Sequence, residues 1–188
     1  MKAIFFKYHA DHTKRDLRDG AENICGLIDP DFRSHELPIW SVCGPYVRKT
    51  LEIGDVVFFL PIKSKAKKAG IWNGYSSFTG VLVVDKTLTN MAQLLQDPKI
   101  SSSYKRKYKR SLLNHLNGDR LQTRNIRPQR IILGSKAKSM WIWPKQKFHV
   151  SEFSNVLDLR DFAKRRVPFL VDKKKIKSLY HKLTNKQL

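Results

Sequence analysis

The fold is decided by the stretch "IWSVCGPYVRKTLEIGDVVFFLP", residues 39–61. A short helix is predicted between Gly44 and Gly54, because Pro45 is tolerated in the first turn of a helix and Gly54 is typical of the position just beyond a helix end. The apolar run after Gly54 lacks the alternation of a half-exposed strand, so it predicts a strand buried on both faces. Phe58 and Phe59 are adjacent in that strand, and their side chains should therefore enter the core on opposite faces.

Further strands are predicted on both sides of this stretch. They are the apolar or aromatic segments 2–8, 77–88, 129–135, 139–144 and 167–171. Short helices are predicted at 89–97 and 154–165, whereas the polar residues 9–38 are typical of a long ordered loop. Short strands around short helices predict an α+β fold, namely a small, strongly curved β-barrel with short helices at its ends.

The C-terminal residues 172–188 predict a lysine-rich helix with one apolar face. Its apolar residues recur at the spacing i, i+3, i+4 and i+7, and they are Ile176, Leu179, Tyr180 and Leu183. Residues 99–128 read as a basic, polar insertion without a predicted strand. A chain of 188 residues fits one domain, so we expect 1–188 to fold as a single unit that carries both features.

Charge is the outstanding property of the composition. Lysine and arginine number 37 against 16 aspartate and glutamate residues, which gives a formal net charge of +21 and a pI near 10.2. Such a field attracts polyanions, and nucleic acid, either DNA or RNA, is the expected partner. The alternative is a habitat adaptation, because lysine-rich surfaces also occur in thermophiles.

The cysteine count and the N-terminal residues bear on the cellular location of the protein. Cys25 and Cys43 are too few for a disulfide scaffold or a cysteine-based zinc site. Met1 leads directly into a predicted strand, and no apolar stretch approaches the roughly 20 residues that span a bilayer. We therefore expect a cytoplasmic protein with no membrane partner, no metal and no cofactor, and leave its oligomeric state open.

Two motifs in the opening stretch carry a family resemblance. "CGPYVR" (43–48) and "IGDVV" (53–57) resemble the "C-x-P-x-I-R…GD-x-V" signature of the nucleotide-modification-associated domains. "NGDR" (117–120) and the aromatic segment 130–144 resemble later parts of that family, with Trp141 and Trp143 where the family usually has a Phe/Tyr pair and a glycine. The resemblance covers 1–150 in patches. It implies a PUA-like fold related to ASCH, EVE and YTH domains, and a role linked to DNA or nucleotide modification.

Aromatic side chains are the candidates for base recognition. PUA-like readers hold a base between aromatic walls, and stacking on one ring is worth about 1–3 kcal/mol. Most candidates lie in predicted loops or at strand ends, which favours a pocket rim. The predicted pocket residues are Trp40, Tyr46, Trp72, Tyr75, Trp141 and Trp143. The alternative is that some of them fill the ends of the barrel.

Cationic runs are the candidates for contact with the nucleic-acid backbone. In "YKRKYKR" (104–110), Tyr104 and Tyr108 are interleaved with cations, a pattern that suits phosphate contact combined with stacking. The predicted backbone contacts are Arg48, Lys63, Lys65, Lys67, Lys68, Lys105, Arg106, Lys107, Lys109, Arg110, Arg127 and Arg130. Any single run could equally be a solvated face, and Arg48 could instead pair with a structural carboxylate.

The sequence therefore predicts a nucleic-acid-binding module that recognises a base, foremost a modified one, in an aromatic pocket. One alternative is a nuclease or nucleotide-tailoring enzyme of the ASCH type. The catalytic candidates are His9, Asp11 and His12, a set that a plain polar loop explains better because no third anchored metal ligand is evident, and His115 with Asp119 is a second, equally loose pair. A basic module that docks an acidic protein through the C-terminal helix is the other alternative.

Overall fold

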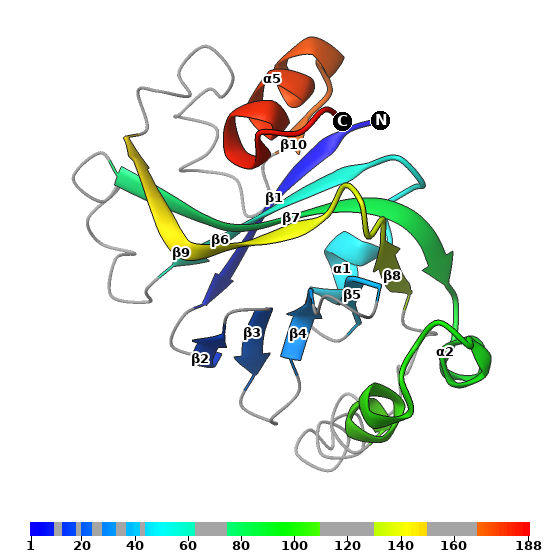
Figure 1. Ribbon diagram of the computed structural model, residues 1–188. Helices are drawn as coiled ribbons and strands as arrows, with labels where there is room; N and C mark the ends of the chain where they lie inside the picture. The colour runs from blue at the N-terminus through cyan, green and yellow to red at the C-terminus, as the bar shows by residue number, and fades with distance from the viewer. Residues whose placement is uncertain are drawn as a thin grey trace.

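The computed structural model describes residues 1–9, 13–17, 20–23, 28–32, 37–41, 44–62, 75–109, 130–149 and 169–188. These residues form a mixed α+β fold, in which short helices cover a strongly curved open sheet (Figure 1). The strands are β1 (Ala3–His9), β2 (Thr13–Leu17), β3 (Gly20–Asn23), β4 (Ile28–Asp31), β5 (Ile39–Trp40), β6 (Val56–Ile62), β7 (Tyr75–Leu88), β8 (Ile131–Gly134), β9 (Met140–His149) and β10 (Phe169–Leu170). The helices are α1 (Pro45–Arg48), α2 (Met91–Gln96), α5 (Lys173–Thr184) and the helical residues 102–109.

The long strand β7 joins two half-sheets. Its first part lies between β6 and β9, and its last part pairs with β8 after a register shift between Val84 and Lys86. The first half-sheet is β10-β1-β6-β7-β9, in which β1 and β6 are parallel, and the second is β8-β5-β4-β3-β2. Among the described strands, β10 and β2 end the strand order without pairing to each other, so these strands do not close a barrel.

The described side chains at the centre of the first half-sheet are buried on both faces. Val56 and Phe58 of β6 pack with α5 on its outer face, whereas Val57 and Phe59 pack in the interior between the two half-sheets. β1 follows the same alternation, with Phe5 outside and Ile4 inside. The prediction that adjacent residues of β6 enter the core on opposite sides is confirmed. It follows from the two-residue period of a strand that has neighbouring layers on both sides.

The second half-sheet adds two more layers. Trp40 and Ile132 face the interior, whereas Ile39 and Leu133 pack outward against a cluster that includes Leu94 of α2 and the helical residues 102–109. The order of layers is therefore α5, first half-sheet, interior, second half-sheet, and the helices at 91–109. α5 and residues 102–109 consequently lie on opposite sides of the molecule (Figure 1).

Asp55 fixes the entry into β6. Its buried carboxylate accepts hydrogen bonds from the backbone N–H groups of Lys2 (2.8 Å) and Glu52 (2.9 Å), and Lys2 Nζ lies 3.0 Å away. Gly54 before it has φ 85°, a left-handed conformation that glycine adopts without strain, and its N–H bonds Val84 O at 2.8 Å. The "GD" pair is thus a structural turn that aligns β1, β6 and β7.

Most predicted elements are confirmed, but the described strands leave the predicted barrel open, and two further expectations are wrong. The predicted helix after Gly44 is only one turn long and ends at Arg48. The polar residues 9–38 are not one long loop, since they contain β2, β3 and β4, short strands at the polar edge of the second half-sheet. The predicted helix at 154–165 lies outside the described residues. Within the described part of the chain, every helix is too short or too polar to cross a membrane.

α5 should contribute strongly to stability, because its apolar face completes the outer layer of the first half-sheet. Leu179 is 1% exposed there. We expect Leu179→Ala to lower the free energy of unfolding by about 2–5 kcal/mol, through lost burial and a residual cavity. Lys177→Ala on the exposed side of the same helix should change it by less than about 0.5 kcal/mol. Urea denaturation compares the two, and equal effects would contradict this role of α5.

Candidate nucleic-acid interface

Trp40 is a core residue. It is completely buried in β5, with its ring 4.6 Å from that of Phe6 and 5.2 Å from that of Phe59, centroid to centroid. Gly44 lies against the same rings, and a Cβ at this position would come within 2.6 Å of Phe6 and 2.9 Å of Trp40. The prediction that Trp40 lines an open base pocket is corrected, because it fills the interior between the half-sheets and has no exposed area on which a base could stack.

Trp141 is also packed inside. It lies in β9 at 8% exposure, with its ring 5.5 Å from that of Phe32, and Gly80 on β7 leaves the space it occupies, since a Cβ there would come within 2.5 Å. The reason is common to both tryptophans, because two curved half-sheets leave an interior that only large apolar side chains fill. Trp141 is therefore part of the core and not part of an open pocket wall.

Tyr46 is the one predicted pocket residue whose described side chain is open to solvent. It lies in α1 at 82% exposure, with Lys49 Nζ 5.5 Å from its ring centroid. Gly44, at φ 64°, starts the helical turn, and burial of Val47 and Arg48 leaves Tyr46 on the outer side. The other three predicted pocket residues are not placed, because Trp72 and the side chains of Tyr75 and Trp143 lie outside the described residues.

Arg48 does not contact solvent. It is completely buried, and its Nη1 donates a hydrogen bond to the backbone carbonyl of Arg130. The prediction that Arg48 binds a phosphate is corrected, because its guanidinium instead holds α1 against the start of β8. Arg130 is partly exposed, and its own guanidinium also forms hydrogen bonds. Its Nη1 donates to Lys49 O at 2.9 Å, just after α1, and its Nη2 donates to Thr87 Oγ1 at 3.4 Å.

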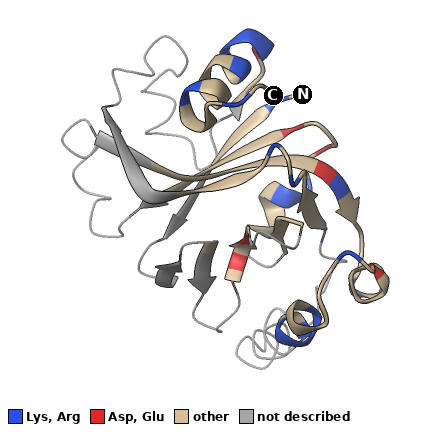
Figure 2. Ribbon diagram, in the orientation of Figure 1, with Lys and Arg blue, Asp and Glu red and all other residues tan. Residues whose placement is uncertain are grey.

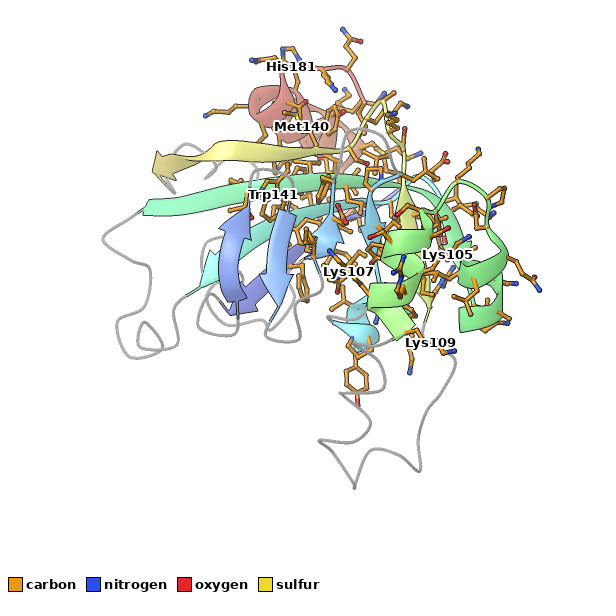
Figure 3. The ribbon with its side chains drawn as sticks, turned by 60° about the horizontal axis from the view of Figure 1, so that its bottom comes forward. Lys105, Lys107, Lys109, Met140, Trp141 and His181 are labelled. Carbon is orange, nitrogen blue, oxygen red and sulfur yellow. The ribbon has the colours of Figure 1, made fainter. Side chains whose placement is uncertain are left out.

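The helical residues 102–109 divide into a buried aromatic side and an exposed cationic side. Tyr104 and Tyr108, one turn apart, are buried with their rings stacked at 6.5 Å, so the interpretation of these two rings as a stacking platform is wrong. Arg106, Lys107 and Lys109 are exposed and Lys105 is half-buried, and Figure 3 labels the three lysines on this helix. The remaining predicted contacts lie outside the described residues, and they are Lys63, Lys65, Lys67, Lys68, Arg110 and Arg127.

Beneath this helix lies a buried polar cluster that the sequence did not suggest. Asp29 Oδ1 accepts hydrogen bonds from Ser41 N at 2.6 Å and Ser41 Oγ at 3.3 Å, and Ser41 Oγ lies 2.8 Å from the Tyr104 hydroxyl. The cluster ties β4, the end of β5 and the helix together. The only local signal was the pair of aspartates in "IDPD", whose partner Tyr104 lies far along the chain.

The cluster changes the titration of both buried tyrosines. Burial raises the pKa of Tyr104, and the carboxylates of Asp29 and Asp31 raise it further. Burial also raises the pKa of Tyr108 to about 12, against a partial lowering by the positive charge of Arg48. The effect of Arg48 on Tyr108 means that the buried guanidinium of α1 lies within electrostatic reach of the inner side of the helix 102–109.

No catalytic centre is visible in the described residues. His9 ends β1, but its side chain, like Asp11 and His12, lies outside the described residues. Among the residues that are described, no three His, Cys, Asp or Glu side chains lie close enough together to hold a metal ion.

The candidate interface therefore has two exposed parts, α1 and the helix 102–109, which pack on different clusters of the core. We call it the Tyr46 face, and it comprises Tyr46, Lys49, Arg106, Lys107 and Lys109. Figure 2 shows that lysine and arginine colour both elements. In comparisons with known proteins, no family model, curated protein or solved structure matches this chain.

The raised pKa of Tyr108 predicts a loss of stability at alkaline pH. An unfolded tyrosine ionises near pH 10, whereas folded Tyr108 keeps its proton to about 12. Between these values the unfolded chain binds fewer protons, so the free energy of unfolding falls by up to about 1.4 kcal/mol per pH unit. We expect Tyr108→Phe to flatten this decline in urea titrations between pH 9.5 and 11.5, a window set by those two values. Parallel curves for parent and variant would contradict the assignment.

Proposed function

We propose that this protein is a nucleic-acid-binding module that holds an accessible base, foremost a modified one, at its Tyr46 face. The observation that carries the proposal is the pairing of an aromatic ring at 82% exposure with a lysine 5.5 Å from its centroid. An exposed ring offers a surface on which a nucleobase can stack, and every nucleobase presents a face that fits it.

The charges of the Tyr46 face supply the second half of the proposal. Arg106, Lys107 and Lys109 point to solvent from a helix whose inner side is fixed by Tyr104 and Tyr108. Rigidly mounted cations suit the phosphate backbone, which determines affinity without reading sequence. Stacking on Tyr46 would then favour an unpaired or extruded base, because a base inside a duplex does not offer its face to a side chain.

The wider setting we propose is a PUA-like module related to the nucleotide-modification-associated domains. Two half-sheets that pack across an aromatic interior suit a barrel of that kind, and "CGPYVR" contributes Tyr46 to the proposed face. Its Arg48 is given a structural role, since it holds α1 and thereby positions Tyr46. Trp72, Tyr75 and Trp143 remain candidates for a pocket wall beside the stacked base.

Removing the Tyr46 ring should weaken binding to single-stranded oligonucleotides. Loss of one stacking interaction of about 1–3 kcal/mol corresponds to roughly a fivefold to hundredfold rise in Kd for Tyr46→Ala. Tyr46→Phe keeps the ring and serves as the matched control, so it should bind within about twofold of the parent. Fluorescence anisotropy across modified and unmodified oligonucleotides at fixed salt measures both variants. The proposed stacking role fails if Tyr46→Ala binds as tightly as Tyr46→Phe.

Neutralising the cations should act differently from removing the ring. The triple variant Arg106→Gln, Lys107→Gln, Lys109→Gln should weaken modified and unmodified oligonucleotides by the same factor. It should also reduce the slope of log K against log[salt] by about 0.7 per lost phosphate contact, or about 2 in total. Glutamine retains helix propensity, so the buried side of the helix should stay folded. An unchanged salt slope would show that phosphates are bound elsewhere.

A further inference from the structure

α5 presents a second cationic surface that the proposed function does not use. Its sequence, "KKKIKSLYHKLT", contains no acidic residue, and its lysines point to solvent. The turn 136–138 extends this surface, because it is tied to the helix by the Tyr180 hydroxyl, which donates to Lys138 O at 2.6 Å. We call this surface the α5 face, and it comprises Lys136, Lys138, Lys174, Lys175, Lys177 and Lys182.

The fold separates the α5 face from the cations of the helix 102–109. α5 packs on the outer side of the first half-sheet through Ile176 and Leu179, whereas the helix 102–109 packs on the outer side of the second half-sheet through Tyr104 and Tyr108. Figure 3 shows His181 of α5 and the labelled lysines of the other helix in separate regions. The sheet layers lie between the two helices, so one short strand cannot contact the cations of both.

The composition of the α5 face differs from that of the Tyr46 face. The aromatic residue of α5, Tyr180, is completely buried, so the helix offers cations without a stacking surface. Asp172, the nearest acid in the sequence, caps the helix, because its carboxylate accepts hydrogen bonds from the N–H groups of Lys174 (2.9 Å) and Lys175 (3.1 Å). A surface of point charges suits phosphates and reads no bases.

From these observations we infer that the α5 face is a second, sequence-independent phosphate-binding surface, and that its ligand is the backbone of duplex nucleic acid. The 12 residues of α5 extend about 18 Å, and a duplex presents one negative charge per roughly 1.7 Å of its axis. The helix can therefore follow several phosphates. A duplex fits better than a membrane, because the apolar residues that an interfacial helix would insert are buried against the sheet.

This inference goes beyond the proposed function, and each can fail without the other. Together they describe a protein that holds duplex backbone on α5 while Tyr46 takes a base from a single-stranded segment. Such an arrangement suits a junction between duplex and single strand, or two separate nucleic-acid segments.

The test compares two matched charge-neutral variants of the full chain. One is Lys174→Gln, Lys175→Gln, Lys177→Gln on the α5 face, and the other is Arg106→Gln, Lys107→Gln, Lys109→Gln on the Tyr46 face. Each removes the same number of positive charges from the exposed side of one helix. Anisotropy with a labelled 20-base-pair duplex and with a labelled single strand that cannot pair gives four affinities relative to the parent, with salt slopes read as in the counterion-release relation.

We expect the α5 variant to lose at least about tenfold in duplex affinity and about 3 in the duplex salt slope, at about 0.9 per lost phosphate contact, and to bind the single strand within about twofold of the parent. The Tyr46-face variant should show the opposite pattern. An α5 variant that binds duplex like the parent would overturn the inference. Equal losses from both variants on both ligands would also overturn it, because they would indicate only the overall charge.

If the α5 variant loses binding to phosphatidylserine vesicles while its duplex binding stays intact, the α5 face would be reassigned to a membrane surface. If the parent binds duplex but not single strands, the proposed function fails and this inference survives.

Discussion

The whole arrangement depends on one strand, β6, that is buried on both faces. Phe58 on one side packs against α5, and Phe59 on the other contacts Trp40 and Phe32 in the interior between the half-sheets. A strand with this property needs a complete layer on each side, and the chain supplies one through α5 and the other through the curvature of β7 into the second half-sheet. The turn at Asp55 fixes where β6 begins, and therefore which residues enter which layer.

The need to fill both core layers with apolar side chains also explains which residues are left on the surface. Trp40, Trp141, Tyr104 and Tyr108 all enter the core, although the last two stand beside lysines in the sequence. Tyr46 remains exposed because α1 is a single turn. Its last two residues, Val47 and Arg48, are buried, and Tyr46 therefore points to solvent. Lysine and arginine side chains are costly to bury without partners, and they remain on the outer sides of α5 and the helix 102–109. The two faces of the protein are thus consequences of the layering.

The sequence predicted best those elements whose pattern is local. β6 follows from an uninterrupted apolar run, and α5 follows from four apolar residues at helical spacing that are all buried as expected. The strands β2 to β4 were missed because an edge with polar side chains lacks a hydrophobic period. The burial of Trp40 and the hydrogen bond between Ser41 and Tyr104 could not be predicted, since both depend on partners brought together only by the tertiary fold. Arg48 was misassigned for the same reason, because its acceptor is a backbone carbonyl of Arg130.

The central claim is that the base is held on the outside of the molecule, at Tyr46, and not among the tryptophans inside. Photo-crosslinking with a single-stranded oligonucleotide that carries 5-iodouracil, followed by mass spectrometry of the linked peptides, tests it most directly. The account predicts that the crosslinked peptide contains Tyr46 and that yield falls as salt displaces the strand. A crosslink at Trp40 or Trp141 would contradict it, because the base would then have to enter the closed aromatic interior.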